Sequence, residues 1–211
     1  MSWFYYFSKF LIKRFFLIFW GFTVEGKKNV PSTGGFILAP NHVSFLDPPV
    51  VGSACPRKVY FLAKIELFSV PLLSFWMKEV GVMPLYHSAH DKSSLKKAVE
   101  LLKSGECVCI FPEGGRVPPG ITKPAEPGIS FIAKLANVPV VPAAILGTQP
   151  WNRKILGFIP WFSRLKVRFG PPIAMDFSKE TNHKERESFQ KNADFILKKI
   201  NELKSDKLRQ N

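Results

Sequence analysis

The sequence has few cysteines and few acidic residues for its size. Its 211 residues include three cysteines. Their number is odd, and their spacing does not match a disulfide framework or a metal site, which fits a reducing compartment. Only 16 residues are acidic, against 30 lysines and arginines, so the formal charge is +14. A chain this basic favours an acidic partner, such as nucleic acid, an anionic lipid surface or a phosphorylated substrate. Composition alone does not distinguish these partners.

The chain also lacks a long uncharged hydrophobic run, although 46% of it is hydrophobic and 14% is aromatic. Three basic residues interrupt the aromatic N-terminus, so its longest uncharged runs are residues 1–8 and 15–24. A helix that spans a bilayer needs roughly 20 residues with few or no charges. No small-residue cleavage site follows, which argues against a secretory signal. The hydrophobic content excludes a disordered basic tail, and the length predicts one stable domain.

Residues 1–22 are predicted to form an interfacial membrane helix ahead of a globular domain of residues 23–211. On a helical wheel Lys9, Lys13 and Arg14 share one side, and Phe4, Leu11, Phe15 and Ile18 lie on or near the other. Such a helix places its apolar side in the acyl boundary and its cations among anionic headgroups. The alternative is a helix that packs on the protein's own core. The other basic residues are dispersed, so we expect an anionic membrane surface and no nucleic acid as partner.

After residue 23, short apolar strands alternate with helices. Strands are expected at residues 36–41, 59–64, 82–85, 107–111 and 138–146, and an alternating edge strand at 165–170. Helices are expected from Pro48 and at residues 66–80, 91–103, 128–136 and 182–207. This alternation predicts an α/β fold with a mainly parallel sheet, covered by helices on both faces.

Two segments with reactive side chains directly follow expected strands, where ligand sites form in parallel sheets. The first runs from Asn41 and His42 to Asp47. A strand–turn–helix corner can fold His42 back towards Asp47, and an aspartate that accepts from one imidazole nitrogen leaves the other as a general base. The alternative is an ordinary loop histidine beside an aspartate that caps the next helix.

The second segment reads Phe111-Pro-Glu113-Gly114-Gly-Arg116. A pair of glycines lets backbone N–H groups approach a ligand closely, and the Arg116 guanidinium matches phosphate or carboxylate. The alternative is a tight turn with a surface arginine.

Together, the Asn-His-x-x-x-x-Asp and Phe-Pro-Glu-Gly-x-Arg segments resemble the glycerolipid acyltransferase family, whose bacterial members include 1-acyl-sn-glycerol-3-phosphate acyltransferases. Gly81-Val-Met-Pro84 and Val138-Pro-Val-Val-Pro142 also match, and the order and spacing agree from about residue 24 to residue 170. The resemblance implies acyl transfer from acyl-CoA or acyl carrier protein to the hydroxyl of a lysophosphatidic-acid-like acceptor in phospholipid synthesis. It also implies a peripheral or monotopic protein on the cytoplasmic face of the cell membrane, with no bound cofactor and no metal ion.

The resemblance also implies roles for individual residues. His42 and Asp47 form the catalytic pair, which acts on the acceptor hydroxyl without a covalent acyl-enzyme. The substrate-binding residues are Asn41, Lys64, His87, Glu113, Gly114 and Arg116. A serine hydrolase is disfavoured because the sequence contains no G-x-S-x-G.

The sequence departs from the family pattern in three ways. Gly115 and Val117 replace the usual threonine and serine. His87 lies after Gly81-Val-Met-Pro84, where the family usually has an arginine associated with the acceptor phosphate. The alternatives are therefore another lyso-lipid or hydroxylated lipid as acceptor, or a non-catalytic lipid-binding protein at the membrane surface. The family's N-terminal membrane motif has two helices, and about 20 residues allow one helix here.

Two further segments have expected roles. Residues 151–162 mix tryptophan, phenylalanine and basic residues, so they are predicted to form a second membrane contact. His87, His90 and Asp91 are interpreted as a helix cap and surface residues rather than as a metal site.

Overall fold

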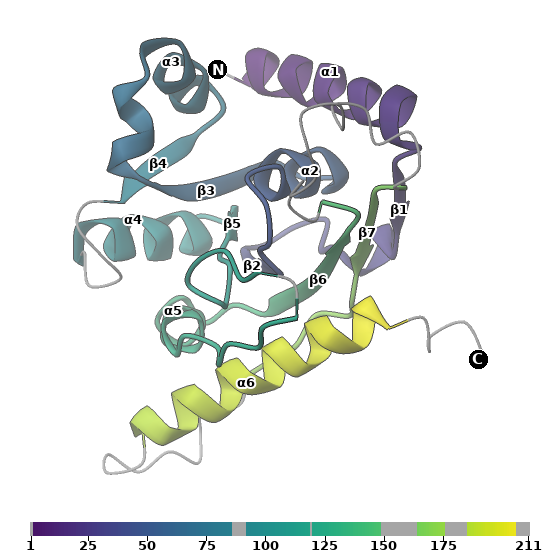
Figure 1. The fold of residues 1–211 in the computed structure, drawn as a ribbon. Coiled ribbons are helices and arrows are strands. Elements are labelled where there is room, and N and C mark those ends of the chain that lie inside the picture. Colours follow the sequence, from purple (N-terminus) through teal and green to yellow (C-terminus); the bar gives the residue numbers. More distant parts are fainter. Residues whose placement is uncertain (1, 86–91, 119, 149–163, 176–184, 206–211) are drawn as a thin grey trace.

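The computed structural model describes residues 2–85, 92–118, 120–148, 164–175 and 185–205 (Figure 1). His87, the possible metal ligands His90 and Asp91, and the predicted membrane contact at 151–162 lie outside these residues. The described chain folds into a seven-stranded sheet with the order β1-β7-β6-β2-β5-β3-β4.

Most of the sheet is parallel. The strands are β1 (Thr23–Glu25), β2 (Phe36–Pro40), β3 (Val59–Lys64), β4 (Val82–Leu85), β5 (Cys107–Cys109), β6 (Val140–Leu146) and β7 (Lys166–Phe169). The neighbouring strands β6, β2, β5, β3 and β4 pair in parallel, whereas β7 is antiparallel to β6 and β1 is parallel to β7. The predicted parallel sheet is confirmed, with two reversed strands at one side.

The prediction of an edge strand at residues 165–170 is wrong. Strand β7 lies between β6 and β1, and residues 167–169 are buried. The true edge is β1, which is only three residues long. A strand of this length is too short to show the alternation by which strands are recognised in a sequence.

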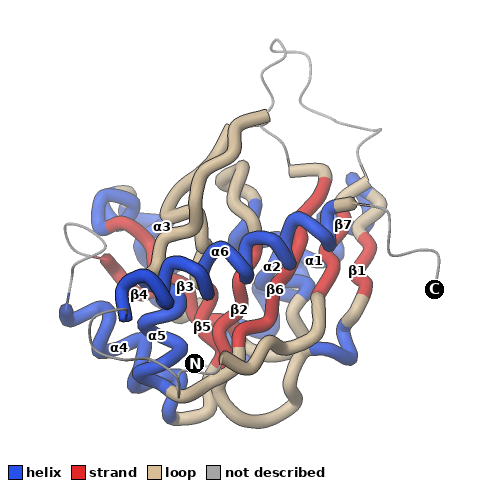
Figure 2. Tube along the Cα trace, turned by 90° about the horizontal axis from the view of Figure 1, so that it is seen from below, coloured by secondary structure: helices blue, strands red, loops and turns tan. Residues whose placement is uncertain are grey.

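Helices cover both faces of the sheet, as predicted. The α-helices are α1 (Ser2–Trp20), α2 (Asp47–Ala54), α3 (Pro71–Glu79), α4 (Lys92–Lys103), α5 (Gly128–Ala136) and α6 (Glu185–Lys204), with short 3-10 helices η1 (Lys27–Asn29) and η2 (Ile65–Ser69). In Figure 1, α1, α2 and α3 lie above the sheet and α4, α5 and α6 lie below it. Figure 2, seen from below, shows α4, α5 and α6 in front of the strands.

The central strand β2 is buried on both faces. Phe36 and Leu38 pack in the core on the side of α1 and α2, and Ile37 and Ala39 pack in the core on the side of α4, α5 and α6. Alternate residues of a strand point to opposite faces, so a strand covered on both faces is hydrophobic throughout. The three cysteines are free and are buried in the core on the side of α1 and α2.

The sequence pattern predicted a helical stretch over residues 66–80 interrupted by Pro71, and the structure confirms the interruption, because helix α3 begins at Pro71. The residues before it form η2, and Val70 in the extended conformation separates the two helices. Proline lacks a backbone N–H and disfavours helical geometry in the residue before it, so it fits best at the start of a helix.

One side of α1 packs on the domain. Tyr5 and Phe16 are buried, and the Tyr5 hydroxyl accepts a hydrogen bond from the Val59 N–H at 3.0 Å. Lys9 donates to the carbonyl oxygens of Cys55 and Arg57, just after α2. The expectation that Lys9 points towards lipid headgroups is therefore wrong, because its ammonium group caps the end of α2.

The other side of α1 is exposed and largely aromatic. Its exposed apolar residues are Trp3, Tyr6, Phe7, Phe10, Leu11, Phe15, Leu17, Ile18 and Phe19. The alternative interpretation of the sequence, a helix that packs on the protein's own core, therefore describes one side of α1, and a membrane contact of the other side stays a prediction. Within the described residues, no helix is both long and apolar enough to cross a membrane.

Candidate active site

The two segments with reactive side chains follow the carboxyl ends of two neighbouring strands. Strand β2 ends at Pro40, two residues before His42, and β5 ends at Cys109, four residues before Glu113. Because β2 and β5 pair in parallel, their carboxyl ends bring the two segments together. The Val117 N–H donates to the His42 carbonyl oxygen at 2.8 Å, which joins the segments directly.

His42 and Asp47 form a hydrogen-bonded pair. The distance from His42 Nδ1 to Asp47 Oδ2 is 2.8 Å, although five residues separate the two positions. The side chain of Asp47 is fully buried, and that of His42 is 16% exposed. The imidazole also stacks on the Phe111 ring, with centroids 4.0 Å apart. The turn between strand and helix thus brings the pair together, as predicted.

Hydrogen bonding at Asp47 fixes which imidazole nitrogen carries the hydrogen. The backbone N–H groups of Val43 and Ser44 donate to Asp47 Oδ2 at 2.6 and 2.7 Å. This oxygen is therefore an acceptor, and His42 Nδ1 is the donor. In a neutral imidazole Nε2 is then left unprotonated and available to accept a proton.

The alternative role of Asp47 as a simple helix cap does not describe its contacts. Helix α2 begins at Asp47 itself, its N-cap residue is Leu46, and no side-chain cap is present there. The Asp47 carboxylate instead points back at the preceding loop and at His42. Pro48 and Pro49 follow in the first turn, where a missing N–H costs nothing.

Thr148 is a partner of Asp47 that the sequence did not reveal. Its hydroxyl donates to Asp47 Oδ1 at 2.5 Å, and its side chain is buried. Thr148 follows β6, about 100 residues downstream of Asp47 in the chain. A lone threonine after a strand carries no distinctive pattern, so only the pairing of β6 with β2 brings it to the site.

Asn41 is buried and bonds to β6. Its amide nitrogen donates to the Ile145 carbonyl oxygen at 3.1 Å, and its amide oxygen accepts from the Ile145 N–H at 2.7 Å. These bonds extend the β2–β6 pairing by one residue. The geometry gives Asn41 a positioning role next to His42, and the expected contact with substrate stays a prediction.

Glu113 holds the backbone of His42. Its Oε2 accepts a hydrogen bond from the His42 N–H at 2.6 Å, and its side chain is buried. Burial raises the pKa of this carboxyl group, and the bond from the His42 N–H offsets part of the rise. Glu113 therefore fixes the loop that carries the imidazole, and its expected role in substrate binding stays a prediction.

The raised pKa of Glu113 makes a prediction about stability and pH. A carboxyl group whose pKa is higher in the folded state stabilises the fold below its unfolded pKa, and this contribution is lost as pH rises through the folded pKa. Glu113→Gln keeps an oxygen for the His42 N–H but cannot ionise. We expect the melting temperature of Glu113→Gln to exceed that of the wild type at neutral pH.

Scanning calorimetry from about pH 4 to about pH 8 checks this expectation. The advantage of the variant should shrink as the pH falls, because both side chains are then neutral. A difference in melting temperature that is independent of pH would contradict the role given to Glu113 ionisation.

The glycine turn and Arg116 form the exposed part of the site. Gly114 has a φ of +66°, a left-handed conformation that favours glycine, and a Cβ there would also displace the exposed Glu126 side chain. Arg116 is exposed, and its guanidinium lies over the Phe45 ring, 3.6 Å from the centroid. Phe45 belongs to the His42 loop, so this cation–π contact again joins the two segments.

Lys64 is the last residue of β3 and is exposed at the same edge of the sheet. Strand β3 is separated from β2 by β5. The structure thus places Lys64 on the side of the sheet that carries His42, one strand beyond Glu113 and Arg116. His87, which the sequence also proposed here, lies outside the described residues.

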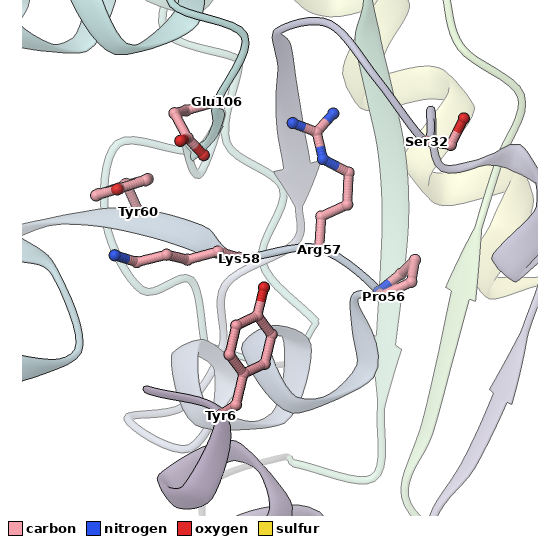
Figure 3. A pocket seen from close by; sticks show the side chains of 7 residues that line it. All are labelled: Tyr6, Ser32, Pro56, Arg57, Lys58, Tyr60 and Glu106. Carbon is pink, nitrogen blue, oxygen red and sulfur yellow. The ribbon is translucent and has the colours of Figure 1, made fainter. Parts of the chain in front are cut away.

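A polar hollow of about 520 Å³ lies at the amino ends of the strands, opposite the candidate site (Figure 3). Arg57 and Lys58 precede β3 and Glu106 precedes β5, so these residues mark the amino ends of the strands. The Arg57 guanidinium is held by carbonyl oxygens of the surrounding turns, including that of Gly34 at 2.5 Å. The hollow is therefore remote from His42 and does not belong to the candidate site.

Comparison with known proteins finds a match that includes both site segments. A family model described as Acyltransferase matches residues 21–146, more than half of the chain. The chain belongs to the acyltransferase family. The matched region contains both site segments and ends at the last residue of β6.

Individual members of the acyltransferase family are similar to this chain. The 1-acyl-sn-glycerol-3-phosphate acyltransferase of Bacillus subtilis is 34% identical over 128 residues, which cover 60% of this chain and 63% of that protein. A chloroplastic 1-acyl-sn-glycerol-3-phosphate acyltransferase of Brassica napus is 34% identical over 128 residues, covering 59% of this chain and 37% of that protein. The chain thus matches less than two thirds of the length of these relatives.

A solved structure shares the fold. The crystal structure of the 1-acyl-sn-glycerophosphate acyltransferase of Thermotoga maritima matches with a TM-score of 0.71 and 26% identity, over 95% of this chain and 80% of that one. The family resemblance inferred from the two segments is confirmed, and so is the mostly parallel α/β fold.

Proposed function

We propose that this protein transfers a fatty acyl group from a thioester donor, acyl-CoA or acyl carrier protein, to the hydroxyl of a lysophosphatidic-acid-like acceptor. The observation that carries the proposal is the His42–Asp47 pair, with Nδ1 and Oδ2 2.8 Å apart at the carboxyl edge of the sheet. The 1-acyl-sn-glycerol-3-phosphate acyltransferases to which the chain is similar support this choice of acceptor.

In the proposed reaction, His42 Nε2 removes the proton from the acceptor hydroxyl as its oxygen attacks the thioester carbonyl carbon. A C–O bond forms, the C–S bond breaks, and the proton passes from the imidazole to the departing thiolate. Asp47 stabilises the imidazolium that exists between these two proton transfers. The products are the acylated acceptor and a free thiol, and no acyl group is attached to the protein.

Cations at the same edge supply a site for the acceptor's phosphate. Arg116 is exposed and is held over Phe45 by a cation–π contact. Lys64 is exposed at the carboxyl end of β3, the strand next to β5. A guanidinium offers paired donors that match phosphate oxygens. We assign Arg116 to the acceptor phosphate and Lys64 to the positive potential around it.

The proposal is tested with a radiolabelled acyl thioester and a panel of acceptors. We expect thiol release with 1-acylglycerol-3-phosphate, and no radiolabelled protein after denaturation. Arg116→Ala should raise the acceptor KM about tenfold or more, in line with the loss of a hydrogen bond to a charged group, while the donor KM stays the same. Thiol release without acceptor, or a stable acyl-protein, would refute the proposed reaction. An equal effect of Arg116→Ala on acceptors without phosphate would refute the role of Arg116.

We further propose an anionic membrane surface as the partner of the exposed side of α1, on the cytoplasmic face of the membrane where acyl donors are present. Phe10, Phe15 and Ile18 are exposed on this side beside the exposed cations Lys13 and Arg14. Helix α1 carries no acidic residue. An apolar surface flanked by cations fits the boundary between acyl chains and anionic headgroups.

Helix α3 extends the apolar surface of α1. The ring of Phe4 contacts that of Phe75, with centroids 6.4 Å apart. Leu72 and Phe75 of α3 are 81% and 59% exposed. The apolar surface offered to the bilayer therefore comprises residues of both helices, and their contact fixes one helix against the other.

Flotation with vesicles that contain phosphatidylglycerol tests the membrane partner. We expect Phe10→Asp/Ile18→Asp to reduce the vesicle-bound fraction at least about tenfold, because each apolar side chain contributes about 1.5–3 kcal/mol when buried. Phe195→Asp is the matched control, since Phe195 is a partly exposed aromatic residue of α6, on the other face of the sheet. Equal binding of the wild type and the α1 variant would contradict the proposal.

A further inference from the structure

The Asp47 carboxylate has a different set of partners on each of its oxygens. Oδ2 faces His42 and the loop N–H groups, whereas Oδ1 accepts the Thr148 hydroxyl at 2.5 Å. Asp47 and Thr148 are 0% and 1% exposed. The Thr148 hydroxyl is thus a buried donor to a buried carboxylate, and such charge-assisted hydrogen bonds are short and strong.

The fold places Thr148 through two separate constraints. The double hydrogen bond between Asn41 and Ile145 fixes β6 beside the start of the His42 loop. Gly147 then turns the chain with a φ of +88°, and a Cβ there would lie 2.7 Å from the Arg164 carbonyl oxygen. The close approach of the 164–165 backbone therefore permits only glycine, and the turn directs Thr148 towards Asp47.

We propose that Thr148 is a positioning residue, which sets the rotation of the Asp47 carboxylate so that Oδ2 faces His42 Nδ1. This inference rests on the proposed function for its effect on turnover. A carboxylate held at only one oxygen can rotate about its Cβ–Cγ bond, and this rotation weakens its hold on the imidazole. A donor on the opposite oxygen prevents the rotation. In this proposal the buried Thr148 contacts Asp47 and neither the acyl thioester nor the acceptor lipid.

Two variants separate the hydroxyl from the methyl group. Thr148→Val keeps the volume and removes the hydroxyl, whereas Thr148→Ser keeps the hydroxyl and removes the methyl group. We expect Thr148→Val to lower kcat about tenfold to hundredfold with unchanged KM for both substrates, because a hydrogen bond to a charged group is lost. Thr148→Ser should stay within about threefold of the wild type. Thr23→Val, at an exposed threonine of β1, should have no effect.

The opposite ranking would overturn the inference. If Thr148 serves only to fill space, Thr148→Val retains kcat and Thr148→Ser loses it. Circular dichroism and thermal unfolding of both variants show whether a lost activity reflects a lost fold.

A measurement that does not depend on turnover separates this inference from the proposed function. In nitrogen-15 spectra of the histidine side chains, we expect wild-type His42 to carry its hydrogen on Nδ1. Thr148→Val should give a mixture of tautomers, and Thr148→Ser should resemble the wild type. A wild type without acyl transfer but with this pattern refutes the function and retains the role of Thr148. An unchanged His42 spectrum in Thr148→Val refutes the role of Thr148.

Discussion

His42→Ala is expected to lower kcat for acyl transfer by about 10²–10⁴-fold, the usual contribution of a general base. The imidazole is the group placed to take the acceptor proton, because its Nδ1 is bound to Asp47 and its Nε2 is left as an acceptor. The rate is measured as thiol released from the acyl thioester in the presence of acceptor.

The fold should survive the loss of the imidazole. The His42 side chain is partly exposed, and the hydrogen bonds to Glu113 and Val117 are made by its backbone N–H and carbonyl groups. These bonds remain in the alanine variant, so its melting temperature should stay within a few degrees of the wild-type value. Undiminished turnover in a folded His42→Ala protein would exclude His42 as the base.

Asp47→Ala is expected to lower kcat by about 10²–10⁴-fold, no more than the loss of His42, because Asp47 acts through the imidazole. It should also lower the free energy of unfolding by about 2 kcal/mol, because the Val43 and Ser44 N–H groups and the Thr148 hydroxyl lose their acceptor. Both quantities are measured on the same preparation, by thiol release and by urea unfolding.

Asp47→Asn separates the charge of this residue from its geometry. With its amide oxygen in the place of Oδ2, asparagine still accepts from the loop N–H groups and His42, and its NH₂ group can donate to Thr148. The tautomer and most of the stability should therefore be retained, while the imidazolium loses its negative partner. We expect kcat to fall about 10–100-fold, less than in Asp47→Ala. Equal kcat losses in the two variants would show that charge alone matters.

Much of the fold was predictable because its strands are covered on both faces. Such strands are short runs of apolar residues, as in residues 36–40, and they stand out between amphipathic helices. The exceptions have local causes. Strand β1 is too short to show a pattern, and β7 is buried between β1 and β6 although it was expected at the edge of the sheet.

The candidate site was only partly predictable, because the same residue types serve as ligands and as scaffold. The sequence predicts that Asn41 and Glu113 contact substrate, and the structure adds a scaffold role that the sequence did not show: Asn41 bonds to Ile145, and Glu113 accepts from the His42 backbone N–H. No local pattern distinguishes a carboxylate that binds a ligand from one that holds a neighbouring loop. Thr148 went unnoticed for a related reason, since its role depends on a strand about 100 residues away from Asp47.

The sequence is short of acidic residues and of long uncharged runs, and the structure shows where the cations of its N-terminus lie: Lys9 contacts the domain, whereas Lys13 and Arg14 are exposed. The sequence by itself determined the mostly parallel α/β fold and the family and marked His42 and Asp47 as a candidate pair, because local hydrophobic period and short motifs carry this information. Only the tertiary structure decided that Lys9 binds the end of α2, that α1 uses one side for the core, and that Thr148 completes the Asp47 site. Those contacts join residues distant in the chain, and only the packing of helices and strands brings them together.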